Sequence, residues 1–241
     1  MEMDVKCVSC GEDGAEILIS GKLLCPRCSR QEILHRVRKN LGKAGVNLRG
    51  SQVILAYPKF YSEISQFLKY LIEKVCQNCN FMISEVIVEN GREINSVIRN
   101  LILEVERHPE NLVILPFTAD FYGAYLVYSS SSLENSYLSL YGLKSEVAGK
   151  TLVSPLYDTP ITELRGFQEL TGELKTGDEV FDTILKWLHS SFGDNEVFHT
   201  FPPSILAILG KFSRCRRCGA VIRPDSGEYC KACLTELSLG R

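Results

Sequence analysis

Long apolar segments are missing from this chain of 241 residues. The longest, such as Gln52–Tyr57 and Leu112–Phe117, fall far short of the ~20 residues that a membrane-spanning helix needs. The opening residues Met1–Lys6 include two acidic side chains and no apolar run, which is unlike a secretory signal peptide. We therefore expect a cytoplasmic protein without a membrane span.

Glycine is missing where a phosphate-binding loop would need it. The first buried strand is predicted at Val53–Tyr57, and the turn after it, Tyr57–Ser62, reads Tyr-Pro-Lys-Phe-Tyr-Ser. In nucleotide-binding α/β folds this turn is rich in glycine and presents backbone N–H groups to phosphate beside a helix N-terminus. Here Pro58 removes one donor and three aromatic rings add bulk. We expect no nucleotide pyrophosphate to bind at this turn in the usual way.

Cysteine, in contrast, is abundant. All ten cysteines fall into five Cys-x-x-Cys pairs, and disulfides are rare in a reducing compartment, so the pairs indicate metal binding or catalysis. Two pairs with 14 residues between them form one set of four, and two pairs with 11 residues between them form another. The first set is Cys7, Cys10, Cys25 and Cys28, and the second is Cys215, Cys218, Cys230 and Cys233.

This spacing predicts two structural zinc ions, because zinc takes four tetrahedral ligands and one tight turn presents two sulfurs to it. Gly11 and Gly219 directly follow the first pair of each set, where a turn needs an unhindered backbone. An iron–sulfur cluster uses the same ligands and stays an alternative. All four positions of each site are filled by cysteine, so the metal is expected to stabilise a small module rather than to catalyse.

The fifth pair, Cys76 and Cys79, ends the first long helix of the core and has no matching pair nearby in sequence. It is either a metal or redox pair, or a pair of structural cysteines buried at a helix end.

Between the cysteine sets, apolar segments alternate with helical periodicity, which predicts a parallel sheet flanked by helices, an α/β fold. The expected strands are Val53–Tyr57, Ile83–Glu89, Leu112–Pro116 and Leu152–Pro155. The expected helices are Tyr61–Val75, Ile94–Arg107, Ala119–Ser129, Ile161–Leu170 and segments of 178–212, the last starting at Pro202–Pro203. We divide the chain into an N-terminal zinc module (1–30), a basic helix (31–50), the α/β domain (51–212) and a C-terminal zinc module (213–241).

Charge is distributed unevenly. Residues 27–49 hold seven Lys or Arg against one acidic residue, and residues 211–231 hold six against two, whereas 50–210 hold eleven against twenty. Two basic regions that flank an acidic central region favour an anionic partner that binds the two basic regions. The simpler interpretation is that the basic residues only solvate exposed helices.

The order of these parts resembles the tRNA 2-thiolation proteins of the PP-loop ATPase (adenine nucleotide alpha hydrolase) superfamily. The resemblance covers nearly the whole chain and is carried first by Cys-Val-Ser-Cys-Gly and Leu-Cys-Pro-Arg-Cys near the N-terminus, and by Cys-Arg-Arg-Cys-Gly and Gly-Glu-Tyr-Cys-Lys-Ala-Cys near the C-terminus. Leu115–Asp120 lies where the family's second nucleotide-site motif follows a strand. Val153–Leu164 resembles the family's segment Arg-Pro-Leu, two or three residues, Pro-x-x-Glu.

The chain also departs from that family. Of the family's phosphate loop, Ser-Gly-Gly-x-Asp-Ser, only Ser62 is matched, and Asp120 lies near the second-site acidic residue of the family. Cys76 and Cys79 do not align with the core cysteines of catalytic members. No catalytic residue is therefore assigned. The resemblance implies the non-catalytic subunit of a cytoplasmic tRNA 2-thiolation complex, in a short, archaeal-like form.

We accordingly expect a tRNA-binding, zinc-containing subunit that acts with a catalytic PP-loop thiolase or pairs with a second copy of itself. The residues expected to contact tRNA phosphates are Arg36, Arg38, Lys39, Arg214, Arg216 and Arg217. Two alternatives stay open. One is an active tRNA sulfurtransferase that binds ATP in an altered loop and uses Cys76 or Cys79 as sulfur carrier. The other is a zinc-bearing interaction module with no role in RNA binding.

Overall fold

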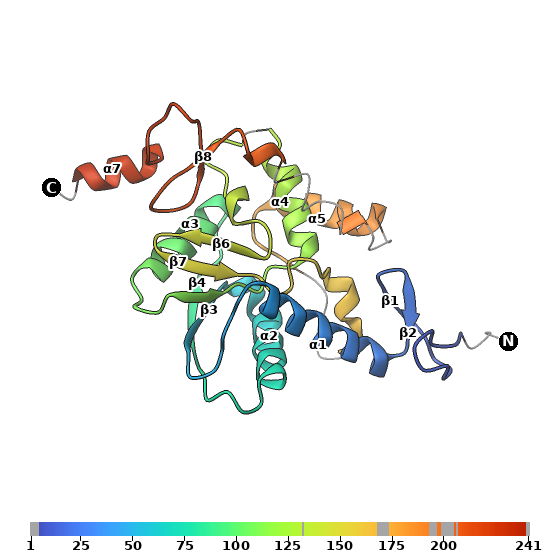
Figure 1. The fold of residues 1–241 in the computed structure, drawn as a ribbon. Coiled ribbons are helices and arrows are strands. Elements are labelled where there is room, and N and C mark those ends of the chain that lie inside the picture. The colour runs from blue at the N-terminus through green and yellow to red at the C-terminus, as the bar shows by residue number, and fades with distance from the viewer. Residues whose placement is uncertain are drawn as a thin grey trace.

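The computed structural model describes residues 5–131, 133–167, 174–192, 197–198, 205 and 207–239. A five-stranded sheet forms the centre (Figure 1), with strand order β4-β3-β5-β7-β6. Four strands run parallel, namely β3 (Gln52–Pro58), β4 (Met82–Val88), β5 (Leu112–Ile114) and β7 (Lys150–Val153). The predicted α/β fold with a largely parallel sheet is confirmed. None of the helices described has the length and apolar character to cross a membrane.

The fifth strand, β6 (Lys144–Val147), was not expected. It pairs antiparallel with β7 through the tight turn Ala148–Gly149, in which both residues have positive φ, 52° and 74°. Two successive residues with φ > 0 are the mark of a two-residue hairpin turn. The hairpin therefore adds an antiparallel edge strand to an otherwise parallel sheet.

Helices follow the parallel strands. They are α2 (Ser62–Val75), α3 (Ile94–Glu106), α4 (Ala119–Ser129) and α5 (Glu179–Ser191). In α2, α3 and α5 the apolar residues recur with the 3.6-residue period of a helix, whereas α4 is buried around most of its circumference. The chain steps from β3 outward to β4 and then back to β5, so right-handed crossovers place α2 and α3 on opposite faces of the sheet. Asp178 caps α5 by accepting hydrogen bonds from the amides of Val180 and Phe181.

Three short 3₁₀-helices complete the domain: η1 (Lys59–Tyr61), η2 (Leu138–Leu140) and η3 (Ile161–Gly166). The helix expected at Ile161–Leu170 is therefore a 3₁₀-helix as far as Gly166, and 168–170 lie outside the described residues. The helix start expected at Pro202–Pro203 also lies outside them.

The two cysteine modules lie at opposite ends of the molecule (Figure 1). The first contains the hairpin β1 (Ile17–Ile19) and β2 (Lys22–Leu24), which turns at Gly21 as expected. The second contains β8 (Ser213–Arg214) and β9 (Val221–Ile222). In both modules the second cysteine pair starts a helix, α1 (Pro26–Lys43) and α7 (Lys231–Leu239). The basic helix thus begins inside the first module rather than after it.

Candidate functional site

The first cysteine set converges on one point. The sulfur atoms of Cys7, Cys10, Cys25 and Cys28 all lie within 4.8 Å of one another. The first pair forms a turn in which the Gly11 amide donates to the Cys7 carbonyl, 2.8 Å, and Gly11 has φ +75°. The second pair sits in the first turn of α1, with Cys25 as N-cap residue and Pro26 at the first helical position. Local turn chemistry thus brings four thiols together, and they could bind a metal ion.

The second set converges in the same way. The sulfurs of Cys215, Cys218, Cys230 and Cys233 lie within 4.8 Å of one another, and all four residues are buried. Gly219 has φ +77°, and its amide donates to the Cys215 carbonyl, 2.9 Å. Both predicted cysteine sets are therefore assembled, and each could bind a metal ion.

A metal binds the thiolate rather than the thiol, so the pKa values of the cysteines matter for ligation. The pKa of Cys7 is lowered to about 6, chiefly by a hydrogen bond from the Cys25 backbone. The pKa of Cys215 is lowered to about 4, chiefly by a hydrogen bond from the Cys218 side chain. The shifts within each set are opposed, because burial and the neighbouring thiols raise the pKa of Cys10, Cys28, Cys218 and Cys233.

The first module is anchored to the core through η3. Gly166 of η3 lies so close to α1 that a Cβ atom there would come within 2.1 Å of Ser29 Oγ. Near it, the Glu163 carboxylate is fully buried and accepts hydrogen bonds from the Ser20 amide, 3.0 Å, and from the Arg36 guanidinium. The segment that resembles the family's Pro-x-x-Glu motif therefore holds the first module in place.

The prediction that Arg36 contacts phosphate is contradicted by its position. Arg36 is only 9% exposed, and its guanidinium forms an ion pair with Glu163. It also donates to Ser20 Oγ, 3.0 Å, and to Thr159 Oγ1, 3.2 Å. Arg36 points inward because it shares a helix face with Ile33, and it joins α1 to η3.

The second module is anchored to the core at several points. The Val221 amide donates to the Ser136 carbonyl, 2.7 Å, and Ser139 Oγ donates to the Gly219 carbonyl. A Cβ atom at Gly219 would come within 2.8 Å of the Val147 side chain on β6. The unexpected hairpin β6–β7 therefore packs against the turn that carries Cys215 and Cys218.

The crevice where α/β folds bind nucleotides lies at the carboxyl ends of β3 and β5, because the chain turns to opposite sides of the sheet there. Tyr61, which follows β3 in η1, fills it and is fully buried. Its hydroxyl lies 2.9 Å from Thr118 Oγ1 and accepts a hydrogen bond from the Thr118 amide, 3.2 Å. Thr118 follows β5, so a phenol bridges the two strand ends.

Aromatic packing closes the rest of the crevice. The ring centroid of Tyr61 lies 5.3 Å from that of Phe117 and 5.5 Å from that of Phe121. The Phe60 amide donates to Asn90 Oδ1, 2.9 Å, and so does not face the crevice as a free phosphate ligand. Burial raises the pKa of Tyr61 well above its usual value, and the charge of Asp120 adds to this effect.

Asp120, which lies near the family's second-site acidic position, is fully buried. It accepts hydrogen bonds from the Ile161 amide, 2.9 Å, and contacts His189 Nε2, 3.0 Å. Its carboxylate therefore joins α4 to η3 and α5.

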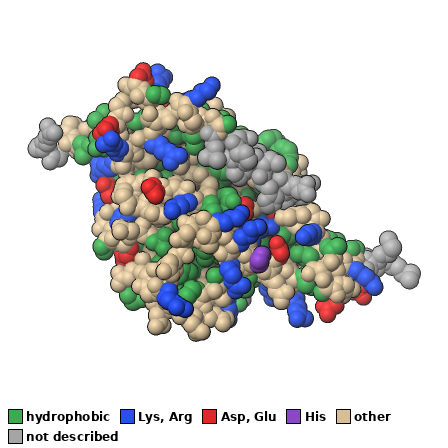
Figure 2. Space-filling model, viewed as in Figure 1, with side chains coloured by type: hydrophobic (Ala, Val, Ile, Leu, Met, Phe, Trp, Pro, Cys, Tyr) green, Lys and Arg blue, Asp and Glu red, His purple; other side chains and the backbone are tan. Residues whose placement is uncertain are grey.

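The two basic regions differ in their partners. On α1 the exposed cations Arg27, Arg30, Arg38, Lys39 and Lys43 form no ion pair with any residue described. Figure 2 shows basic side chains gathered on the face that α1 crosses.

In the second module Arg216 pairs with Glu228, 2.6 Å. Arg217 pairs with Glu236, 3.0 Å, and with Glu106, 3.4 Å. Of the three arginines predicted there, only Arg214 is exposed with no ion pair among the residues described.

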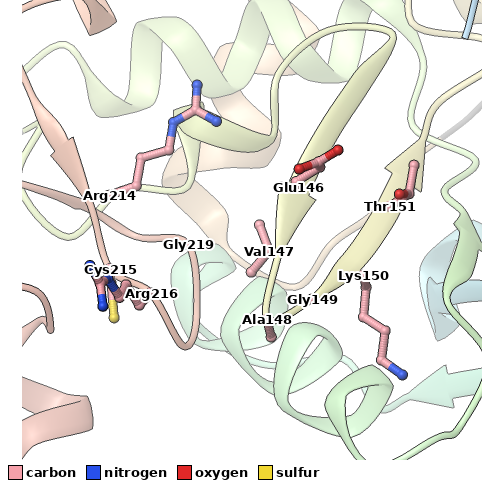
Figure 3. Close-up of a pocket in the computed structure, with 10 residues that line it drawn as sticks. All are labelled: Glu146, Val147, Ala148, Gly149, Lys150, Thr151, Arg214, Cys215, Arg216 and Gly219. Carbon is pink, nitrogen blue, oxygen red and sulfur yellow. The ribbon is translucent and has the colours of Figure 1, made fainter.

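A cavity of about 440 Å³ lies between the β6–β7 turn and the second module (Figure 3). Two of the cations that line it, Arg214 and Lys150, point away from one another. The Lys150 ammonium donates to the carbonyls of His108 and Glu110, the latter at 2.9 Å. The cavity therefore lacks a point where several cations meet an anion.

Cys76 and Cys79 form a disulfide at the end of α2, just before β4 begins. They lie at the amino end of β4, whereas the crevice lies at the carboxyl end of its neighbour β3. The strand between these ends has seven residues, which corresponds to ~20 Å.

Together these features define a class: an α/β protein with a largely parallel five-stranded sheet, a buried tyrosine between two of its strand ends and a four-cysteine site near each end. No protein-family model matches the sequence, and no curated protein matches it either. Among solved structures, the chain is similar to the U34-tRNA thiolase NcsA from Methanococcus maripaludis with its [4Fe-4S] cluster. The TM-score is 0.61 at 16% identity, over 100% of this chain and 98% of that one. A likeness at this identity establishes the fold alone.

Proposed function

We propose that this protein is a zinc-containing, tRNA-binding, non-catalytic subunit that acts with a catalytic PP-loop partner in 2-thiolation of a wobble uridine. The observation that carries this proposal is the Tyr61–Thr118 contact, which fills the nucleotide crevice of a thiolase-like fold. In the reaction that the resemblance implies, the partner adenylates the uridine and replaces its 2-oxygen with sulfur. This chain would bind and orient the RNA.

The packing of the crevice supports a non-catalytic role. Seating a triphosphate between β3 and β5 would require Tyr61 to leave a fully buried position and lose its bonds to Thr118. Fully burying a large apolar side chain stabilises a protein by about 1.5–3 kcal/mol. A nucleotide would have to offset that loss without the backbone donors of a glycine-rich turn.

The exposed face of α1 is the proposed RNA surface. Its cations run from Arg27 to Lys43, a helical distance of ~24 Å, and no described carboxylate neutralises them. Lysine and arginine that contact phosphates give affinity that falls with salt, with a logarithmic slope of about −0.9 per contact on a duplex. Arg216 and Arg217 would have to break their ion pairs with Glu228 and Glu236 before they could contact a phosphate.

Zinc is the metal that we propose for both sites. A tetrahedral ion with Zn–S bonds of ~2.3 Å separates its sulfurs by ~3.8 Å. The sulfurs of Cys10 and Cys25 lie 3.8 Å apart, and those of Cys218 and Cys230 lie 3.6 Å apart. These separations support a single ion, because a cluster of several iron atoms would hold its thiolates further apart. Metal analysis of the purified protein should find two zinc ions per chain and no iron.

The proposal of a non-catalytic subunit is tested by isothermal titration with ATP. We expect no binding at 1 mM nucleotide, in the presence or absence of magnesium. Micromolar affinity that is lost in Ser62→Ala would instead support an active sulfurtransferase. That alternative also requires a sulfur carrier near the crevice, and Cys76 and Cys79 lie about one strand length away from it.

The RNA surface is tested with two matched double variants. Arg38→Ala with Lys39→Ala removes two cations of α1 that form no ion pair with a described residue, whereas Arg216→Ala with Arg217→Ala removes two that do. In filter binding with total tRNA we expect the first variant to lose affinity at least tenfold and the second less than threefold. Absence of tRNA binding by the wild-type protein would favour an interaction module without an RNA role. Capture of the protein with a PP-loop thiolase from its native source would support the partner.

A further inference from the structure

The outer edge of the sheet at β4 has an unused row of backbone groups. The Met82 amide donates to the Ser51 carbonyl, 3.0 Å, so Met82 directs its backbone groups toward β3. Because successive residues of a strand alternate, Ile83, Glu85 and Ile87 direct theirs outward. Within the described parts of the chain, β4 pairs with β3 only, and these outward backbone groups form no hydrogen bond with another backbone group.

The edge also lacks the usual protection against pairing. Natural edge strands are kept short, charged, bulged or covered. β4 has seven residues, no proline and one charged residue, Glu85. At the opposite edge, β6 has four residues, of which Lys144 and Glu146 are exposed. β4 therefore differs from β6 in length and in charge.

The side chains beside this edge are apolar and exposed. Met82 is 61% exposed on one face of the sheet, and Ile87 is 52% exposed on the other. Tyr70, on the adjacent helix α2, is also exposed. Single exposed apolar residues are common, but here they flank an unpaired strand and lie on both of its faces.

We propose that two copies of this chain pair through β4, antiparallel and about a two-fold axis at Glu85, to form one continuous ten-stranded sheet. A two-fold interface brings the same surface of both copies together. Centred on Glu85, this register sets Ile83 of one copy opposite Ile87 of the other, and Met82 opposite Val88. Each exposed apolar side chain then meets an apolar partner, and the outward residues form hydrogen-bonded pairs.

The charges at the axis are balanced. Each Glu85 carboxylate has Lys69 of its own chain at 2.8 Å and Gln66 at 2.9 Å. Two Glu85 side chains that meet at the axis therefore bring two Lys69 ammonium groups with them. This pairing is independent of tRNA binding and stands whether or not the protein binds RNA.

Sedimentation of the zinc-loaded full chain, without RNA, tests the proposal. We expect a species of about twice the 27.1 kDa chain mass at micromolar concentration. Ile87→Lys should raise the dimer dissociation constant at least tenfold. The matched control is Val180→Lys on α5, a residue that is 62% exposed and belongs neither to β4 nor to α2, and it should leave the constant unchanged. Circular dichroism confirms that both variants are folded.

Hydrogen exchange identifies the edge itself. The amides of Ile83, Glu85 and Ile87 should become protected as protein concentration rises. The amides of Ser84 and Val86, which face β3, should be protected at every concentration. A wild-type protein that stays monomeric at 100 μM overturns the proposal. So does a dimer that Ile87→Lys leaves intact, or one in which the three outward amides exchange at the same rate at all concentrations.

Discussion

Replacing Arg36 with alanine should destabilise the protein without weakening RNA binding. The side chain is 9% exposed and pairs with Glu163, which is fully buried. Removing one partner of a buried ion pair typically costs about 3–5 kcal/mol. The Ser20 amide still donates to Glu163 in the variant, so we expect the lower end of this range. A loss of about 3 kcal/mol lowers the melting temperature of a chain of this size by ~6–12 °C.

The matched control is Arg38→Ala on the same helix. Arg38 is exposed and has no ion pair among the residues described, so its loss should change stability by less than about 0.5 kcal/mol. Differential scanning calorimetry compares the two variants, and filter binding of tRNA is measured well below both melting temperatures. Arg38→Ala should weaken tRNA binding several-fold, whereas Arg36→Ala should not.

A third variant tests whether the loss of stability comes from leaving one buried charge without its partner. Arg36→Met combined with Glu163→Leu replaces both charges with apolar groups of similar length, a change that is often neutral in other proteins. We expect this variant to recover most of the stability lost in Arg36→Ala. The reasoning fails if Arg36→Ala melts within 1 °C of the wild type, or if it weakens tRNA binding as much as Arg38→Ala does.

Three further perturbations probe the anchors of the fold. Tyr61→Phe keeps the ring but removes the hydrogen bonds to Thr118, so chemical denaturation should show a loss of about 1–2 kcal/mol. Asp178→Ala removes the cap of α5 and the hydrogen bond that Asp178 accepts from the Ile94 amide at the start of α3. Urea unfolding should show a loss of about 2 kcal/mol for this variant, and less than half of that loss for Asp178→Asn. Burial raises the pKa of Tyr57 to about 12, so the folded protein retains this proton above pH 10. The contribution of Tyr57 to stability is then constant below pH 10 and falls between pH 10 and 12, which urea unfolding of the wild type and of Tyr57→Phe at each pH should show as a shrinking difference.

The sequence predicts the strands of the core well because apolar runs are a local signal. β3, β4 and β5 were each located within two residues of their observed ends, because each is an apolar run, which in β3 and β5 is also largely buried. The cysteine sites were also predictable, because ligand spacing of this kind is itself local. The start of α1 was missed because its first turn is also the second cysteine pair of the module.

Long-range contacts account for what the sequence did not reveal. β6 has only four residues, and its position depends on pairing with β7 and on contact with Gly219. Arg36 has the residue type of a phosphate ligand, and its role changes only because Glu163 lies opposite. The helical spacing from Ile33 and Val37 was a signal that Arg36 faces the core. For Tyr61 the sequence showed bulk in the turn, but the bond to Thr118 requires the fold.

The first metal site and the buried ion pair act on the same helix. Cys25 and Cys28 hold the first turn of α1, and Arg36 holds its middle against η3. Asn40 of α1 also donates to the Pro155 carbonyl, 2.9 Å, and to Asp158 Oδ1, 2.8 Å. The direction of α1, and with it the spacing of the cations on its outer face, is therefore kept even when Arg36 is replaced. Phosphates along an RNA backbone are also regularly spaced, and binding to a preformed row costs less ordering than binding to a mobile one. In this way a metal that touches no RNA would raise RNA affinity, by holding the start of the helix on which the basic residues lie.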